Sequence, residues 1–321
     1  MDMQKRWIIL FVALLSISFL GLFYSGHEGV FTDIDSNLNF ADIAWMITAT
    51  IFVLMMTPGL SFFYGGMVRS KNVISTMLQS FIAMGVISVI WVVVGFSLAF
   101  GEDVGHFIGN PGTFFMFVNV GGATDKLLAP TIPLALYALF QMKFAIITPS
   151  LITGSFAERV RFSGYLVFMI LFCIFVYCPL AHWTWHPDGF LRQMGVLDFA
   201  GGIVVHASSG VAALAGAIFL GRRKESGQPA NIPFVLLGAA MLWLGWFGFN
   251  AGSSLAANSI AVKAFLNTNT ASATAMMTWV VFDCLRGRKP SAMGAAIGAV
   301  VGLVAITPSA GYVTVGESIF I

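Results

Sequence analysis

Apolar residues occur along this chain in long, nearly uninterrupted stretches separated by short polar segments. A helix needs about 20 apolar residues to cross a hydrocarbon core about 30 Å thick. Eight stretches are long enough, near residues 43–67, 73–100, 131–154, 162–184, 199–220, 232–255, 260–283 and 291–307. The pattern therefore predicts an all-α, polytopic membrane protein with about eight complete spans.

The two ends of the sequence add shorter apolar runs. Residues 1–24 carry Lys5 and Arg6 ahead of an apolar stretch, which is typical of a signal peptide or of an extra span. The residues around position 25 fit a cleavage site poorly, so both interpretations stay open. Residues 25–316 form the predicted main domain, with an incomplete second half. Residues 317–321 are expected to begin a further span that is truncated.

Basic residues predict how the chain is oriented. The loops between successive spans lie alternately on the two sides of the membrane. The loops of one side hold ten basic residues, and those of the other side hold three. The three are Lys126, Arg192 and Lys263. Cytoplasmic loops carry an excess of Lys and Arg, so residues 25–42 and 101–130 are expected outside a cell membrane, plasma or inner.

Composition excludes several classes of protein. The 321 residues are 58% hydrophobic and 9% charged, whereas soluble proteins carry about 25% charged residues. The mean hydropathy of +0.89 excludes a soluble enzyme domain and a disordered chain. With 16 basic against 14 acidic residues, the chain has no excess of positive charge for nucleic acid. Thirty-four glycines favour close packing of helices in lipid.

Polar residues inside a membrane are costly, so they are the first candidates for function. Asp198 stands where it can cap the helix that follows, and His206 lies eight residues further on. Small residues surround His206 and leave room for a narrow lumen. A capping role for Asp198, and a buried histidine that merely bonds a carbonyl, are the alternatives.

Aromatic residues recur near the same predicted membrane depth. Phe140 and Phe144 share one helix face, and Lys143 between them is an unusual charge inside a span. Trp185 ends one span, while Ser253 follows an apolar helix rich in glycine. Together with His206, these residues predict an aromatic cup, a phenylalanine constriction and a deep histidine. Aromatic faces and one hydroxyl acceptor suit a small cation, attracted by about 0.5–2 kcal/mol.

Motifs of enzymes are missing from the sequence. We find neither a Gly-rich phosphate loop nor a paired-carboxylate hydrolase site. The three cysteines lie in or beside apolar runs without metal-ligand spacing. We therefore expect no enzyme activity, no ATP hydrolysis, no metal and no cofactor.

Six ordered segments resemble the ammonium transporter (Amt/Mep/Rh) family over residues 41 to 316. They are PGLSFFYGG at 58–66 with RSKN at 69–72, FQMKF at 140–144, FAERVRF at 156–162, AHWTW at 181–185, DFAGGIVVH at 198–206 and GFNAGS at 248–253. The resemblance implies an eleven-helix protomer with an inverted five-plus-five repeat, a hydrophobic pore in each protomer, and a homotrimer in lipid. It also implies ammonium or ammonia as the substrate.

The same resemblance implies roles for seven positions. Phe140, Trp185 and Ser253 would recruit ammonium, and Phe144 and Phe249 would form a gate. His206 would be a pore and proton-relay histidine, and Asp198 would have an electrostatic or structural role. The cation would be held in the cup and deprotonated, because an isolated charge in an apolar bore costs many kcal/mol.

Two departures from the family pattern are visible. The family's second pore histidine lies in a later span, and the sequence reaches Ile321 before that span. The tail through which PII-type regulators act on relatives would also lie beyond Ile321. Lys143 stands where relatives have a small or apolar residue, and we expect it to lower ammonium affinity. The alternatives to transport are an ammonium-binding sensor and a truncated, non-conducting partner subunit.

Overall fold

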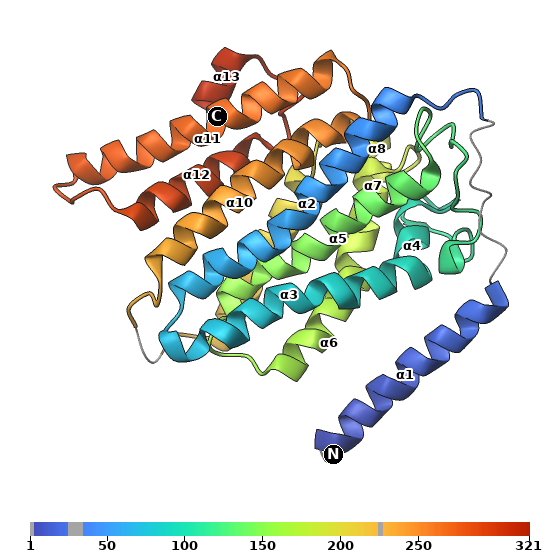
Figure 1. Ribbon diagram of the computed structural model, residues 1–321, viewed down its shortest axis with the longest axis horizontal. Coiled ribbons are helices and arrows are strands. Elements are labelled where there is room, and N and C mark those ends of the chain that lie inside the picture. The colour runs from blue at the N-terminus through green and yellow to red at the C-terminus, as the bar shows by residue number, and fades with distance from the viewer. Residues whose placement is uncertain (1–2, 25–34, 224–226) are drawn as a thin grey trace.

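The computed structural model describes residues 3–24, 35–223 and 227–321 and shows a bundle of long helices (Figure 1). Residues 25–34 and Lys224, which bear on the predicted domain boundary and charge count, lie outside the described residues. The helices are α1 (Met3–Tyr24), α2 (Phe40–Met67), η1 (Ser70–Asn72), α3 (Val73–Ile90), η2 (Trp91–Gly95), α4 (Phe96–Phe100), η3 (Phe115–Phe117), α5 (Leu134–Phe156), α6 (Phe162–Phe172), η4 (Cys173–Tyr177), α7 (Cys178–Trp185), α8 (Phe190–Gln193), η5 (Gly202–Ala207), α9 (Ser208–Leu220), α10 (Ile232–Ala251), η6 (Gly252–Ser254), α11 (Ser259–Leu285), α12 (Ala292–Ile306) and α13 (Val315–Phe320). A short antiparallel hairpin joins β1 (Asp103–Val104) to β2 (Ile108–Gly109).

Every stretch predicted to span the membrane is helical. Among the described residues, six helical segments are long and apolar enough to cross a bilayer. The other two predicted spans differ in detail: α12 has 15 residues, and α11 has 27 residues but includes Lys263 and Asp283. The prediction of an all-helical membrane protein is confirmed, with the last two spans shorter or more polar than expected.

The N-terminal helix α1 stands apart from the bundle (Figure 1). Its apolar side chains, such as Phe11 and Leu22, are exposed. A helix is compatible with both interpretations of residues 1–24, so the choice between signal peptide and extra span stays a prediction. At the other end of the sequence, α13 is capped by Thr314 and Glu317, whose side chains bond each other's backbone N–H groups.

Helices α2 and α10 approach each other closely through glycines. A Cβ atom on Gly238 would lie 2.6 Å from the carbonyl oxygen of Gly59, and one on Gly248 would lie 2.6 Å from that of Ala49. Only glycine fits at such positions, because any side chain would overlap the neighbouring backbone. The seam shows how glycine-rich spans pack tightly, as the composition predicted.

Two π-helical segments lie side by side in the bundle. The rings of Trp91 in η2 and Tyr177 in η4 lie 6.2 Å apart, and Trp91 Nε1 donates to the carbonyl of Ala138 in α5. Each segment continues an α-helix on both sides, so each adds one residue to a turn without ending the helix. Segment η4 therefore sets the direction in which the side chains of α7 point.

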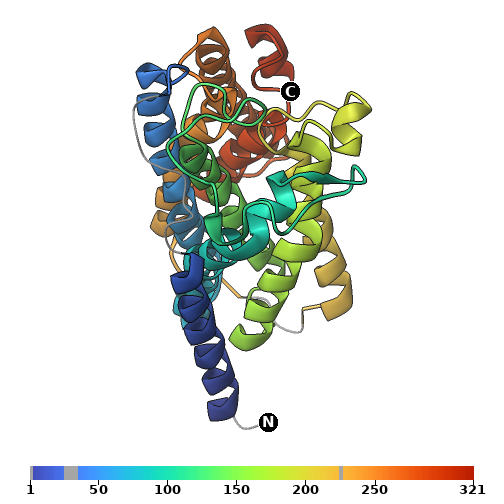
Figure 2. The ribbon, with the colours of Figure 1, turned by 90° about the vertical axis from the view of Figure 1, so that its right-hand side faces the viewer.

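The two ends of the bundle differ in chemistry. At one end, here named the arginine end, Glu158 lies 3.0 Å from Arg69 Nε and 3.5 Å from Arg223 Nη1, and accepts from Asn72 Nδ2 at 2.9 Å. Burial alone would raise the pKa of Glu158, but hydrogen bonds from Asn72 and Arg69 and the charge of Arg69 lower it to about 2. The opposite end, here named the loop end, carries the hairpin and the α4–α5 and α7–η5 connections, and faces the viewer in Figure 2.

Candidate functional site

A cavity of about 350 Å³ opens at the loop end of the bundle. Phe140, Trp185 and Ser253, which the resemblance assigns to cation recruitment, all line this cavity, together with Phe144 and Asp198. They come from α5, the end of α7, η6 and the segment before η5, so four distant parts of the sequence meet here. The cavity presents aromatic faces, a hydroxyl group and a nearby carboxylate to one small volume.

Asp198 lines the cavity and is held in place by four backbone hydrogen bonds. Its Oδ1 atom accepts from the N–H groups of Gly201 and Gly202 at 2.8 and 2.7 Å. Its Oδ2 atom accepts from Ile203 and Val204 at 2.8 and 3.2 Å. These are the orphan N–H groups at the start of η5, so the carboxylate caps that helix. Both oxygens of Asp198 are therefore occupied by backbone N–H groups.

Trp185 is tied to the same segment. Its Nε1 atom donates to the carbonyl oxygen of Asp198 at 3.1 Å, and its ring meets that of Phe144 edge-on, at 5.9 Å between centroids. The indole is only half-buried. Its orientation is thus fixed by a polar contact while part of the ring remains open to the cavity, as a cation–π site requires.

Ser253 supplies the hydroxyl group of the cavity. Its Oγ atom donates to the carbonyl oxygen of Phe249, one turn earlier, at 2.8 Å. Because a hydroxyl donates one hydrogen and keeps two lone pairs, this bond leaves Oγ able to accept from a ligand N–H. The bond to Phe249 also links the cavity wall to the constriction beneath it.

A stack of aromatic rings closes the base of the cavity. Phe144 and Phe249 lie face to face, 4.1 Å apart at 26°, and Phe140 meets Phe144 edge-on at 4.9 Å. Phe144 and Phe249 are 1% and 0% exposed. The closely packed rings separate the cavity from the residues beneath the stack.

His206 lies on the far side of this stack. Its ring packs against Phe249 at 5.9 Å and against Trp246 at 5.3 Å, in both cases nearly parallel. Its Nε2 atom is buried and has no hydrogen-bond partner among the described residues. An unpaired ring nitrogen in an apolar setting is available to a solute.

Some residues of the site were not assigned a role from the sequence. The ring of Trp246 stacks on that of His206. Its Nε1 atom donates to Thr307 Oγ1 at 2.8 Å, which fixes the orientation of the indole. Its i, i+3 spacing from Phe249 is the signal that could have revealed it. Arg192, on the short helix α8, lines the cavity as a cation near the recruitment residues. Nothing in its local sequence indicated this position.

Lys143 lies beside the site without lining the cavity. The residue is 9% exposed, and its ammonium group lies 3.8 Å from the sulfur of Met142. No ion pair to Lys143 occurs within the described part of the chain. The same part of the chain holds no cluster of three or more residues suited to a metal ion.

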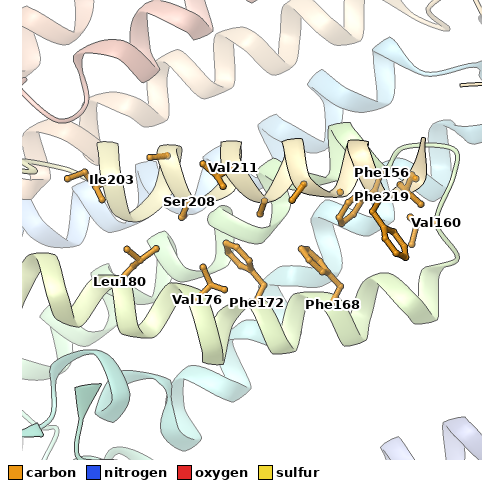
Figure 3. Close-up of a pocket in the computed structure, with 15 residues that line it drawn as sticks. Phe156, Val160, Phe168, Phe172, Val176, Leu180, Ile203, Ser208, Val211 and Phe219 are labelled. Carbon is orange, nitrogen blue, oxygen red and sulfur yellow. The ribbon is translucent and has the colours of Figure 1, made fainter. Parts of the chain in front are cut away.

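A larger groove, of about 790 Å³, runs between the α6–η4–α7 helix and α9 (Figure 3). Phenylalanine and aliphatic side chains such as Phe168, Phe172 and Val211 point into it, and Ser208 is its one polar lining residue. The hydroxyl of Ser208 donates to the carbonyl of Val204. The groove therefore lacks groups that would orient a small cation, and it shares no lining residue with the cavity at the loop end.

Comparison with known proteins identifies the family. A model of the Ammonium Transporter Family matches residues 44–321. The chain belongs to the ammonium transporter family. An ammonium transporter of Aquifex aeolicus is 44% identical over 308 residues, which are 95% of this chain and 72% of that protein. One of Bacillus subtilis is 45% identical over 288 residues, 88% of this chain and 70% of that protein.

Solved structures of the family share the fold. The crystal structure of Saccharomyces cerevisiae Mep2 has a TM-score of 0.84 and 37% identity, covering 90% of this chain and 65% of the Mep2 chain. A structure described as a sensor Amt protein has a TM-score of 0.80 and 31% identity, covering 87% and 71%. The chain thus spans about two thirds of these family members and reproduces their helix arrangement over that part.

Proposed function

We propose that this protein recruits ammonium at the loop-end cavity and moves it across a membrane as ammonia. One observation carries the proposal: the faces of Phe140 and Trp185, the hydroxyl of Ser253 and the charge of Asp198 surround one cavity directly above the Phe144–Phe249 stack. Membership of a family whose relatives are named ammonium transporters supports the same conclusion.

The cavity chemistry accounts for selective recruitment. The aromatic faces attract a cation by about 0.5–2 kcal/mol, and Ser253 accepts a hydrogen bond from one of its N–H groups. Potassium has no hydrogen to donate, so Ser253 would favour ammonium. The buried carboxylate of Asp198 adds a fixed negative charge near the cavity.

The aromatic stack accounts for the form in which the substrate crosses. An isolated charge in an apolar interior costs many kcal/mol, so the cation is deprotonated before it passes Phe144 and Phe249. Neutral ammonia then meets His206, whose Nε2 atom is unpaired and can exchange a hydrogen bond or relay the proton. The proton released from the cation passes to water in the cavity, which opens at the loop end, and any proton that crosses does so separately by a polar route.

The wider arrangement follows from the charge pattern and the family. The loop end faces the exterior of a plasma or inner membrane, and the arginine end faces the cytoplasm. We further propose a multi-pass homotrimer in lipid, with PII-type regulators acting where a C-terminal tail is present.

Uptake of labelled methylammonium by cells devoid of other carriers tests the proposal. Trp185→Leu removes a recruiting face and should raise the half-saturation concentration, by about 2- to 30-fold from the range of cation–π energies. His206→Ala should alter the maximal rate or admit other ions. Trp279→Leu, at a partly exposed residue of α11 that does not line the cavity, is the matched control. If both site variants moved methylammonium as the parent does, the assigned pore would be wrong.

The similarity to a structure described as a sensor Amt protein supports ammonium sensing as a second candidate function. A sensor would bind ammonium in the same cavity and conduct little. Ammonium binding by purified protein that Trp185→Leu weakens, combined with no uptake in cells, would favour this alternative or a non-conducting partner subunit over transport.

A further inference from the structure

His182 lies at the loop end of α7, fully buried, and both of its ring nitrogens face acceptors. Its Nδ1 atom is 3.0 Å from the carbonyl oxygen of Ala99. Its Nε2 atom is 2.9 Å from Oδ1 of Asp103. A carbonyl oxygen and an ionised carboxylate have no hydrogen to donate, so each ring nitrogen must carry one. With Asp103 ionised, both contacts are hydrogen bonds only in the imidazolium form of His182.

The neighbouring histidine has the opposite requirement. His186 stacks on His182 at 4.5 Å and 17°, and its Nδ1 atom accepts from the backbone N–H of Asp188 at 3.1 Å. That nitrogen therefore carries no hydrogen, and the ring is neutral. The other ionisable groups that act on this cluster are the Asp188 carboxylate, 3.9 Å from His186, the carboxylate of Asp125, and the exposed His106, 3.4 Å from Asp103. The stack thus holds one positive charge.

Asp103 provides the matching negative charge. Its Oδ2 atom accepts from the backbone N–H of His106 at 3.0 Å, which holds the carboxylate in place on the hairpin. Burial alone would raise the pKa of Asp103, but the hydrogen bonds from His182 and His106 and the charges of both rings lower it. Asp103 is accordingly ionised at neutral pH and forms the partner that a buried cation needs.

The position of this pair connects it to the recruitment cavity. Trp185 lies three residues after His182, on the same side of the last turn of α7. The bonds from His182 to Asp103 and Ala99 hold this turn to the hairpin and to α4. The bond from Trp185 to the carbonyl oxygen of Asp198 holds the same turn to the segment before η5. The indole is fixed between these two attachments.

Resting on the proposed function, we propose that the buried His182 and the partly exposed Asp103 form an ion pair that positions Trp185 for cation recruitment. Both act through Trp185, so they are positioning residues. The pair ties the outer hairpin to α7. Loss of either charge would release the end of the helix and turn the indole away from the cavity.

The protonation state of His182 tests the ion pair directly. Nitrogen NMR of protein labelled at its five histidines, in lipid vesicles at neutral pH, should show one buried ring with both nitrogens protonated. His182→Gln should remove this signal, and Asp103→Asn should convert it to a neutral ring, so the assignment rests on two variants. A neutral His182 in the parent protein would overturn the inference.

Methylammonium uptake tests the positioning role. Asp103→Asn and His182→Gln should each raise the half-saturation concentration by about 2- to 30-fold while the maximal rate stays unchanged. The double variant should do no more than either single variant, because one pair is lost in each case. Asp188→Asn, which alters a carboxylate of the connection between α7 and α8 that forms no ion pair with His182, is the control. Multiplied effects in the double variant, or a loss of maximal rate alone, would refute the role.

The two readouts separate this inference from the function on which it rests. A parent protein that moves no methylammonium would contradict the proposed transport, and the nitrogen spectrum would then decide by itself whether the ion pair exists. A transport-competent parent with a neutral His182 would contradict the ion pair alone.

Discussion

Replacing Asp198 by asparagine should destabilise the start of η5 by an amount that the hydrogen bonds of Asp198 define. Asparagine keeps one oxygen for Gly201 and Gly202 but turns an amide toward Ile203 and Val204. Two bonds to a charged group, at about 1.5 kcal/mol each, make the expected loss about 3 kcal/mol. Asp198→Ala removes all four bonds and should cost about 6 kcal/mol.

Thermal unfolding of the detergent-solubilised protein, followed by tryptophan fluorescence, measures this effect. At about 2 °C per kcal/mol, the midpoint should fall by about 6 °C for asparagine and about 12 °C for alanine. Asp188→Asn, at an exposed residue, should shift it by about 1 °C. Equal losses for the two Asp198 variants, or losses no larger than that of the control, would refute the cap as the source of stability.

Two further predictions concern Glu158 and Lys143. Glu158→Gln should lower the free energy of unfolding by about 1–3 kcal/mol, since Arg69 and Asn72 lose a charged acceptor. The pKa of Glu158 is lowered from 4.5 to about 2, so its contribution is complete above pH 4.5 and lost as pH falls toward 2; denaturant titrations should show this loss in the parent and not in the variant. Lys143→Met removes a buried cation next to Phe144 and should lower the half-saturation concentration for methylammonium severalfold. Unchanged uptake kinetics would contradict this effect of Lys143.

Features that depend on one helix at a time could be predicted from the sequence. The i, i+4 spacing of Phe140 and Phe144 placed both rings on one face, and the structure shows them in contact. Asp198 stands before an apolar run with the residue type of a cap, and it forms four capping bonds. The apolar stretches gave the helices because lipid imposes a fixed length on each span.

Features that depend on contacts between helices could not be predicted. Trp246 can stack on His206 only if α10 and η5 pack against each other with these two residues at the same depth in the bundle. The sequence of either segment alone does not determine this relative position. The same holds for Arg192, brought to the cavity by a short helix after α7. His182 and Asp103, 79 residues apart, carry no shared motif that would have paired them.

The π turn at η4 has a consequence for how this sequence can vary. An α-helix turns by about 100° per residue, so a deletion that restored regular α-geometry would rotate the rest of the helix by about that angle. Such a deletion would turn the Trp185 ring away from the cavity. It would also separate His182 from Asp103 on the hairpin, although no side chain of α7 had been changed. The length of η4 therefore matters for the position of Trp185 as much as the identity of its residues does. We expect insertions and deletions to be tolerated in the loops and not in this segment.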